Sequence, residues 1–323
     1  MKKNIKIAFV DFASDFDIRN NEFSTLLSER YNVIIDDVSP DYLFYSNFGR
    51  EYLKYDCVKI FYTGECIVPD FNLCDYAIAF DNLTFGDRYI RVPLYELFQY
   101  GQRYRTLLDN SYKRIKDKSA FCGFVVSNDQ GMPEREEMFK LLSKYKKVDS
   151  GGRYKNNIGG AVNNKLEFDR QHKFSIVFEN CAYPSYTTEK IVDAFVADTI
   201  PIYYGNPMIG KEFNTKSFIN VHEFSSFENA VKRVIEIDND PELYDSIKSE
   251  PKLTEARTNC EELKSFLYNI FDQEIECARR RPVNTRTAEK EEEQKIYDCY
   301  LRILGRKIKK IKSIIRRFKN KAL

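Results

Sequence analysis

Short apolar runs separated by polar segments recur through the first 120 residues. These runs have the composition and length of strands, and the segment 20–30 between the first two has helical spacing. The predicted strands are residues 5–10, 33–35, 41–46, 58–62 and 76–80. Strands that alternate with helical or loop crossovers are typical of a doubly wound α/β domain.

A second series of alternating strands and helices begins near residue 121. We call the series before it the first register and this series the second register. It predicts strands at 121–126, 148–152, 174–178, 199–204 and 218–221. Helices are expected at 134–146, from Thr187 or Thr188 onward, and at 224–237, whereas 163–169 is expected to be polar and exposed. The chain therefore predicts two Rossmann-like α/β domains followed by a helical region.

The segments between and after these registers set the expected domain boundaries. Residues 101–120 are charged and helical without a clear apolar face, which is typical of a linker or surface helix. A helical pattern continues from Thr254 to about Arg281. We expect domains at 1–118 and 119–270, and a helical region at 271–323.

The tail has a pattern of its own. Apolar residues recur at alternating spacings of three and four, at Leu301, Leu304, Ile308, Ile311, Ile315 and Phe318. Ten basic residues and no acidic residue lie between Arg302 and Lys321, and taking those ten from the net charge of +2 leaves −8 for the rest. One apolar seam with a basic surface predicts an amphipathic helix that binds an anionic membrane through residues 301–321, or a coiled coil.

Composition narrows the class of protein. An acidic body with a basic tail argues against a nucleic-acid-binding protein. The eight cysteines form no C-x-x-C pair and only His172 and His222 are present, so a zinc site is not expected. The start lacks a signal-peptide pattern and no run of about 18 apolar residues occurs, which favours a cytosolic protein with reduced thiols.

The stretch from Phe174 to Gly205 concentrates the polar chemistry. A strand, a polar loop, a helix and a second strand follow one another, and the charged residues cluster after the first strand. Ligands of open α/β sheets bind at that edge, and a helix N-terminus there favours anions. The unit therefore predicts an anion-binding site.

The residue sequence of this stretch is more informative than its predicted secondary structure. Phe-Glu-Asn, Tyr-Thr-Thr-Glu-Lys and Ile-Pro-Ile-Tyr-Tyr-Gly resemble the donor-binding motif of α-1,3-fucosyltransferases, and residues 61–81 are similar to the acceptor-side motif of the bacterial members. The resemblance implies a GT-B fold and inverting transfer of L-fucose from GDP-β-L-fucose. The implied acceptor is the 3-hydroxyl, or the 4-hydroxyl, of GlcNAc in an N-acetyllactosamine-type glycan of the Lewis kind. No divalent metal is expected to be essential and no cofactor is required.

Candidate donor-binding residues follow the two loops of the second register. Lys190, in the first helical turn, runs against the helix dipole, and a bound diphosphate would offset that cost. Arg135 suits bidentate phosphate binding, although a surface ion pair with Glu136 or Glu137 is the alternative. The resemblance implies that Glu189 binds the ribose hydroxyls. The remaining donor-side candidates are Asn128, Asn180 and Tyr186.

The resemblance also assigns the general base. Glu65 of Tyr-Thr-Gly-Glu follows a strand end in the first register, and a carboxylate there could take a proton from a sugar hydroxyl. Tyr62 and Thr63 are the acceptor-side candidates. Cys66 and Cys181 stand where Asn and Ser are common in the family, which leaves acceptor details open.

Two other functions fit the same residues. One is a GT-B transferase that uses another nucleotide sugar, and the other is a non-catalytic, membrane-associated protein that binds a sugar nucleotide. The tail, together with the fucosyltransferase hypothesis, predicts a cytoplasmic protein held peripherally at the inner face of a bacterial cytoplasmic membrane.

Overall fold

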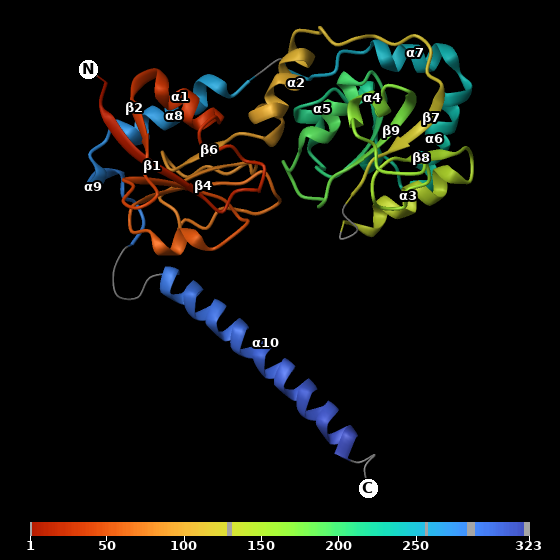
Figure 1. The fold of residues 1–323 in the computed structure, drawn as a ribbon. Coiled ribbons are helices and arrows are strands. Elements are labelled where there is room, and N and C mark those ends of the chain that lie inside the picture. Colours follow the sequence, from red (N-terminus) through yellow and green to blue (C-terminus); the bar gives the residue numbers. More distant parts are fainter. Residues whose placement is uncertain (1, 128–130, 256–257, 283–287, 320–323) are drawn as a thin grey trace.

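The computed structural model describes residues 2–127, 131–255, 258–282 and 288–319, with the side chains of the last helix described in part. In these residues two α/β domains lie side by side, and a long helix extends away from them (Figure 1). Each domain is built on one sheet in which all paired strands are parallel. The predicted fold class is confirmed.

The first sheet has six strands in the order β2-β1-β3-β4-β5-β6. Their bounds are β1 Asn4–Val10, β2 Asn32–Ile35, β3 Tyr42–Tyr45, β4 Val58–Tyr62, β5 Tyr76–Ala79 and β6 Tyr89–Arg91. The helix α1 (Glu22–Arg30) makes the first crossover, capped by Asn21, whose side chain accepts from the N–H of Ser24. The predicted strands are confirmed with small shifts at their ends, and β6 was not predicted.

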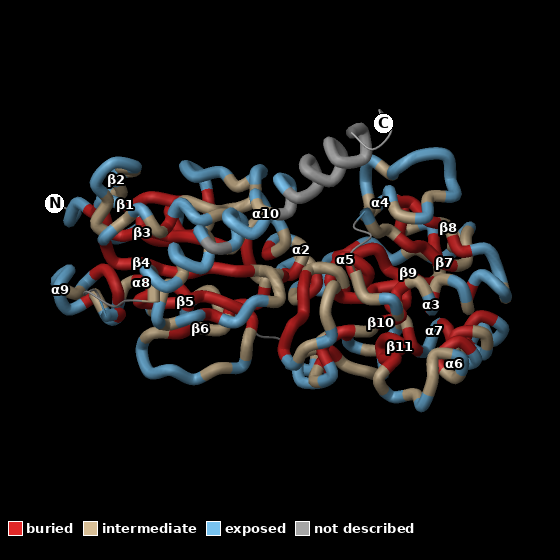
Figure 2. The backbone as a smooth tube through the Cα atoms, turned by 90° about the horizontal axis from the view of Figure 1, so that it is seen from below, coloured by how far each residue is buried: buried red, intermediate tan, exposed pale blue. Residues whose placement is uncertain are grey.

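The second sheet has five strands in the order β11-β10-β9-β7-β8. Its strands are β7 Ala120–Phe124, β8 Val148–Ser150, β9 His172–Phe178, β10 Ile200–Tyr204 and β11 Ile219–Asn220. Its helices are α3 Pro133–Ser143, α4 Lys165–Asp169, α5 Glu189–Val196, α6 Phe227–Asn239 and α7 Pro241–Ser249. β9 is buried along nearly its whole length because helices cover both faces of a parallel sheet (Figure 2).

Two of these helices differ from expectation. The segment 163–169 is not simply polar and exposed, because α4 forms there and buries Phe168 and Asp169. Asp169 is neutralised by Lys165, whose Nζ lies 3.4 Å from its Oδ2. The helix α7, which begins at Pro241, was not predicted.

Each domain contains a helix that the expected boundaries assign to the other part of the chain. The helix α2 (Phe98–Leu108) follows the first sheet, yet Tyr104 and Leu107 pack with Phe195 of α5 in the second domain. The expectation that 101–120 has no apolar face is therefore wrong, since the aromatic side chain of Tyr104 and the aliphatic side chain of Leu107 are buried. The chain therefore begins to pack against the second domain in α2, before the expected boundary at residue 118.

The chain just before residue 270 also packs outside the domain to which the expected boundary assigns it. The helix α8 (Cys260–Phe271) returns to the first domain, where Leu263, Leu267 and Phe271 join the core formed by α1 and the first sheet. The helical pattern of 254–281 is broken between α8 and α9 (Ile275–Ala278). After α9, the buried ion pair between Arg281 and Asp75 fixes the chain to the first domain.

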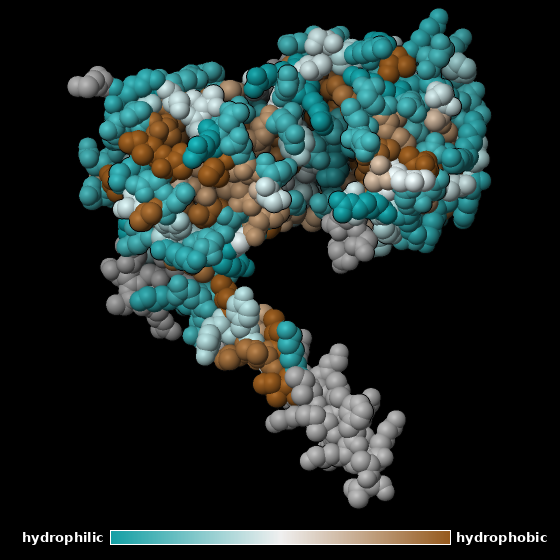
Figure 3. All heavy atoms as spheres, viewed as in Figure 1, coloured by the Kyte–Doolittle hydropathy of each residue, from teal (hydrophilic) through white to brown (hydrophobic). Residues whose placement is uncertain are grey.

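The last helix, α10, spans Ala288–Lys319 and begins before the predicted seam. Its exposed large side chains include Tyr300, Leu301, Leu304 and Ile308. Figure 3 shows hydrophobic atoms along the described part of the helix. Among the described residues, no helix combines the length and apolar character needed to cross a membrane. In the part of the helix whose side chains are described, Leu301, Leu304 and Ile308 of the predicted seam are therefore exposed.

Candidate functional site

The turn between β9 and α5 is organised by a buried glutamate. Glu179, the residue after β9, has no exposed surface. Its Oε1 accepts the N–H of Thr188 at 2.8 Å, and its Oε2 accepts the Thr188 hydroxyl at 2.7 Å. Thr188, one of the two residues at which the helix was expected to start, is the N-cap residue of α5, but its hydroxyl bonds to Glu179 instead of capping the helix. The carboxylate thus fixes the start of α5.

Lys190 joins the same cluster from the first turn of α5. Its Nζ lies 2.9 Å from Oε2 of Glu179 and 2.9 Å from the hydroxyl oxygen of Thr188. Burial opposes the charge on the ammonium group, but the carboxylates of Glu179 and Glu189 outweigh burial and raise the pKa of Lys190. The side chain is therefore a fixed cation at the carboxyl end of β9.

Arg135 reaches the same edge from α3. It is buried, and its Nη2 donates to the carbonyl oxygen of Glu179 at 3.1 Å and to Oδ1 of Asn180 at 3.0 Å. The alternative was a surface ion pair with Glu136 or Glu137. Arg135 pairs with neither in the structure, and Glu136 pairs with Lys140 and Lys155 instead. Burial lowers the pKa of Arg135, although the nearby Glu179 acts in the opposite direction. A guanidinium remains charged in proteins, so a second cation lies beside this turn.

Arg135, Asn180, Thr188 and Lys190 line a pocket of about 340 Å³ between the domains, which we call the interdomain pocket. Lys165 adds a third cation, held 3.1 Å from Oδ2 of Asp193. Predicted residues that line this pocket are Glu65, Arg135, Asn180, Tyr186, Glu189 and Lys190. Tyr186 is buried, and its ring meets that of Phe80 from the first domain at 4.9 Å. Asn128 lies outside the residues that the structure describes.

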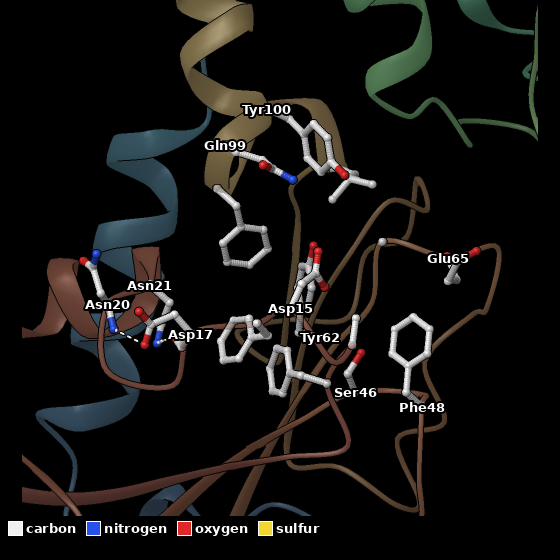
Figure 4. Close-up of a pocket in the computed structure, with 16 residues that line it drawn as sticks. Asp15, Asp17, Asn20, Asn21, Ser46, Phe48, Tyr62, Glu65, Gln99 and Tyr100 are labelled. Carbon is white, nitrogen blue, oxygen red and sulfur yellow. Dashed lines mark hydrogen bonds between the residues drawn. The ribbon is translucent and has the colours of Figure 1, made fainter. Parts of the chain in front are cut away.

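A second pocket of about 450 Å³ opens in the first domain (Figure 4). We call it the first-domain pocket. It is lined by Phe12, Ala13, Asp15, Phe16, Asp17, Asn20, Asn21, Ser46, Phe48, Tyr62, Gly64, Glu65, Leu94, Phe98, Gln99 and Tyr100. Aromatic rings form much of its wall, and the stacked pair Phe12 and Phe16 has a centroid separation of 4.0 Å. Aromatic faces with a few polar groups suit a sugar ring.

The predicted acceptor-side residues have different positions relative to this pocket. Tyr62 lines it, and its buried hydroxyl has no hydrogen-bond partner among the described residues. Thr63 lines neither pocket. Its hydroxyl donates to Oδ1 of Asn47 at 2.8 Å and accepts the N–H of Glu65 at 3.0 Å. Thr63 therefore orients the loop that carries Glu65.

Glu65 is placed where the two pockets meet. Gly64, Glu65, Leu94 and Tyr100 line both of them. Gly64 is packed closely against Leu94, since an added Cβ would lie 3.0 Å from its Cδ1. Glu65 thus lies at the junction of a pocket lined by cations and a pocket lined largely by aromatic rings.

Sequence reasoning missed two residues of the interdomain pocket region. Glu179 stood in the Phe-Glu-Asn motif, but its role in fixing Thr188 and Lys190 depends on the turn geometry. Lys165 lay in a segment expected to be exposed. Among the described residues, no group of three His, Cys, Asp or Glu side chains is arranged to hold a metal ion.

Two facing domains with parallel sheets, and a pocket between them at the carboxyl ends of strands, are the architecture of GT-B glycosyltransferases. Two family models match the chain. The model described as the alpha-(1,3)-fucosyltransferase FucT N-terminal domain matches residues 7–98, and the model described as glycosyltransferase family 10 (fucosyltransferase) C-term matches residues 115–266. The chain belongs to glycosyltransferase family 10, the fucosyltransferases.

Individual relatives agree with this assignment. An alpha-(1,3)-fucosyltransferase FucT from Helicobacter pylori is 37% identical over 267 residues, covering 70% of this chain and 56% of that protein. A crystal structure of an alpha1,3-fucosyltransferase with GDP matches with a TM-score of 0.73 and 30% identity, covering 87% of this chain and 94% of the other. The structure with GDP-fucose gives a TM-score of 0.70 at 29% identity, covering 85% and 92%. The chain spans about half the length of the curated relatives it matches.

Proposed function

We propose that this protein transfers L-fucose from GDP-β-L-fucose to the 3-hydroxyl, or the 4-hydroxyl, of GlcNAc in an N-acetyllactosamine-type acceptor, with inversion to an α-linkage. The observation that carries the proposal is the position of Glu65, which lines both pockets. A base at that junction can reach an acceptor hydroxyl in the first-domain pocket while a donor occupies the interdomain pocket. The relatives named for α-1,3-fucosyl transfer support the donor and the reaction type.

The donor diphosphate is proposed to bind at the carboxyl end of β9. Lys190 and Arg135 line the interdomain pocket there, and the N-terminus of α5 adds its partial positive charge. Both cations are fixed before the ligand arrives, so little reorganisation is needed as charge develops on the leaving diphosphate. Glu189 is proposed to bind the ribose hydroxyls, with Asn180 and Tyr186 lining the nucleotide pocket.

The acceptor step follows from the geometry of Glu65. Its carboxylate is proposed to remove the proton from the acceptor hydroxyl as that oxygen attacks the anomeric carbon of fucose. The bond from that carbon to the GDP oxygen breaks on the opposite face, so a single in-line displacement converts the β-linked donor to an α-linked product. Thr63 holds the backbone of the base, and Tyr62 forms part of the wall beside the acceptor.

No divalent metal or other cofactor is proposed to be essential. Three cations, Arg135, Lys165 and Lys190, line the pocket where the diphosphate charge would develop. Side-chain cations and helix N-termini can stabilise such charge in place of a metal ion.

The tail is proposed to bind an anionic membrane surface. The described part of α10 exposes Leu301, Leu304 and Ile308 along a helix whose sequence carries no acidic residue after Tyr300. A membrane surface accepts both the apolar seam and the basic charge, whereas a coiled coil of two parallel copies would place like charges together. Peripheral attachment to the inner face of a bacterial cytoplasmic membrane would bring the enzyme close to lipid-linked glycans.

One assay tests the reaction directly. The protein is incubated with GDP-fucose and N-acetyllactosamine, and the product linkage is determined by mass spectrometry and NMR. An α1,3- or α1,4-fucosylated product is expected. Thermal unfolding with GDP or UDP provides a second measurement, since a ligand of the native state stabilises it. Stabilisation by UDP alone would favour another nucleotide sugar, and GDP binding without transfer would favour a non-catalytic protein.

A further inference from the structure

The charges in the first-domain pocket are all of one sign. Its lining contains the carboxylates of Asp15, Asp17 and Glu65, and none of the described residues that line it is Lys, Arg or His. The interdomain pocket differs, since Arg135, Lys165 and Lys190 line it. An anionic ligand is therefore favoured in one pocket and disfavoured in the other.

Asp15 is held at this pocket by a short aromatic turn. The N–H of Phe16 donates to the carbonyl oxygen of Ala13 at 3.0 Å, which places Asp15 inside a tight turn. The stacked rings of Phe12 and Phe16 stabilise this turn. The ring of Phe16 also meets that of Phe98 edge-on, with 5.8 Å between the ring centroids. In Figure 4 Asp15 lies in the middle of the lining, between the Asp17 loop and Glu65.

The neighbouring carboxylate has a structural task that Asp15 lacks. Oδ1 of Asp17 accepts the N–H groups of Arg19 and Asn20 at 2.9 and 3.1 Å. Among the described residues, the structure gives the side chain of Asp15 no hydrogen bond and no ion pair. Its carboxylate is therefore available to whatever enters the pocket.

We propose that Asp15, together with Glu65, makes the first-domain pocket selective for glycan ends that carry no carboxylate or sulfate, and that Asp15 is the specificity-determining residue. The inference rests on the proposed function and defines the class of acceptor more closely. Hydroxyl groups of a neutral sugar donate to these carboxylates while the ring packs on aromatic faces. An acidic sugar brings a like charge close to these carboxylates, and their repulsion at low ionic strength disfavours it.

The test compares a neutral acceptor with an acidic one. kcat/KM is measured for N-acetyllactosamine and its 3′-sialylated form at low ionic strength, with EDTA present so that no divalent cation neutralises Asp15. The wild-type protein is expected to prefer the neutral acceptor by about tenfold, and added salt should narrow the preference. Asp15→Asn should reduce the ratio by about fivefold. Asp37→Asn, an exposed carboxylate of the same domain that lines neither pocket, is the matched control and should leave the ratio unchanged.

Two outcomes would overturn the inference: equal use of both acceptors by the wild-type protein, or an unchanged ratio in Asp15→Asn. A binding measurement separates this inference from the proposed function. Saturation-transfer NMR on the GDP-saturated protein reports acceptor binding without turnover. Absence of transfer to the neutral acceptor would refute the proposed reaction, whereas equal binding of the two glycans would refute the selectivity.

Discussion

The side chain of Lys190 is paired with Glu179 across the turn that joins β9 to α5, with 2.9 Å between Nζ and Oε2. A lysine in the first turn of a helix opposes the helix dipole. The sequence predicted that a bound diphosphate would offset this cost, but the buried carboxylate already does so. The cation is therefore held in place before any ligand binds.

The first prediction tests the charge of Lys190. Lys190→Gln keeps a donor that can reach Glu179 but removes the positive charge. GDP affinity should fall by about 10-fold or more, because a charge-assisted contact contributes roughly 1.5–3 kcal/mol. Isothermal titration calorimetry measures the affinity. Lys232→Ala, which removes an exposed lysine of α6, is the control and should bind GDP normally. Unchanged affinity in Lys190→Gln would remove this residue from the donor site.

The second prediction concerns the base. Glu65→Gln preserves the size of the side chain and the N–H contact to Thr63, and it removes the proton acceptor. kcat should fall by about 10²-fold or more with GDP affinity little changed, which is the usual scale for loss of a general base. Steady-state kinetics and calorimetry measure the two effects. Transfer near the wild-type rate would mean that another group takes the proton.

The third prediction is that transfer continues in EDTA. Cations line the proposed diphosphate site, and the Asp238-Asn-Asp240 triplet has structural roles. Asp238 pairs with Lys146 and Lys173, and Asp240 caps α7. Rates with excess EDTA should match rates with added Mg²⁺ or Mn²⁺. Loss of activity in EDTA that either metal restores would contradict the prediction, and Asp15 and Asp17 would then be the next candidates to examine.

The fourth prediction concerns Cys66, next to the base. Burial, together with the neighbouring Cys181, raises the pKa of the Cys66 thiol from 9.0 to about 12. Since only the thiolate reacts, iodoacetamide should label Cys66 slowly at pH 8 and faster as the pH rises toward 12. The exposed Cys277 and Cys299 are internal controls in peptide mass spectrometry. Labelling of Cys66 as fast as these two at pH 8 would show that the thiol is not protected.

The fifth prediction concerns the tail. Full-length protein should pellet with anionic vesicles in a salt-sensitive way, and truncation after Tyr300 should abolish this. Polybasic attraction contributes on the order of 1 kcal/mol per residue, so Lys307, Lys309 and Lys310 changed together to Gln should weaken binding strongly. Reaction with a soluble acceptor should persist after truncation, because both pockets are lined by residues before 200. Equal pelleting of full-length and truncated protein, or none by either, would favour the coiled coil.

Local pattern was sufficient for most of the sheets. Mostly apolar runs such as Val58–Tyr62, interrupted by Lys59, and 174–178, interrupted by Ser175, are expected in parallel strands buried on both faces, and both became strands. The short strand β6 and the short helix α4 were not predicted, because a segment of three to five residues is too short to show a period of apolar positions. The motifs pointed to Glu65, Arg135, Asn180, Tyr186, Glu189 and Lys190, and the structure brings all six to the interdomain pocket.

The sequence by itself determined the two α/β registers, the family motifs and the amphipathic tail, because each is written in neighbouring residues. Tertiary structure decided what distant residues share. The helix α2 packs on the second domain and α8 on the first, since the faces that they cover belong to segments far away in the chain. It also decided that Glu179 would hold Lys190, and that Glu65 would lie where two pockets meet. Such contacts depend on the packing of whole sheets, which no local pattern of apolar and polar residues encodes.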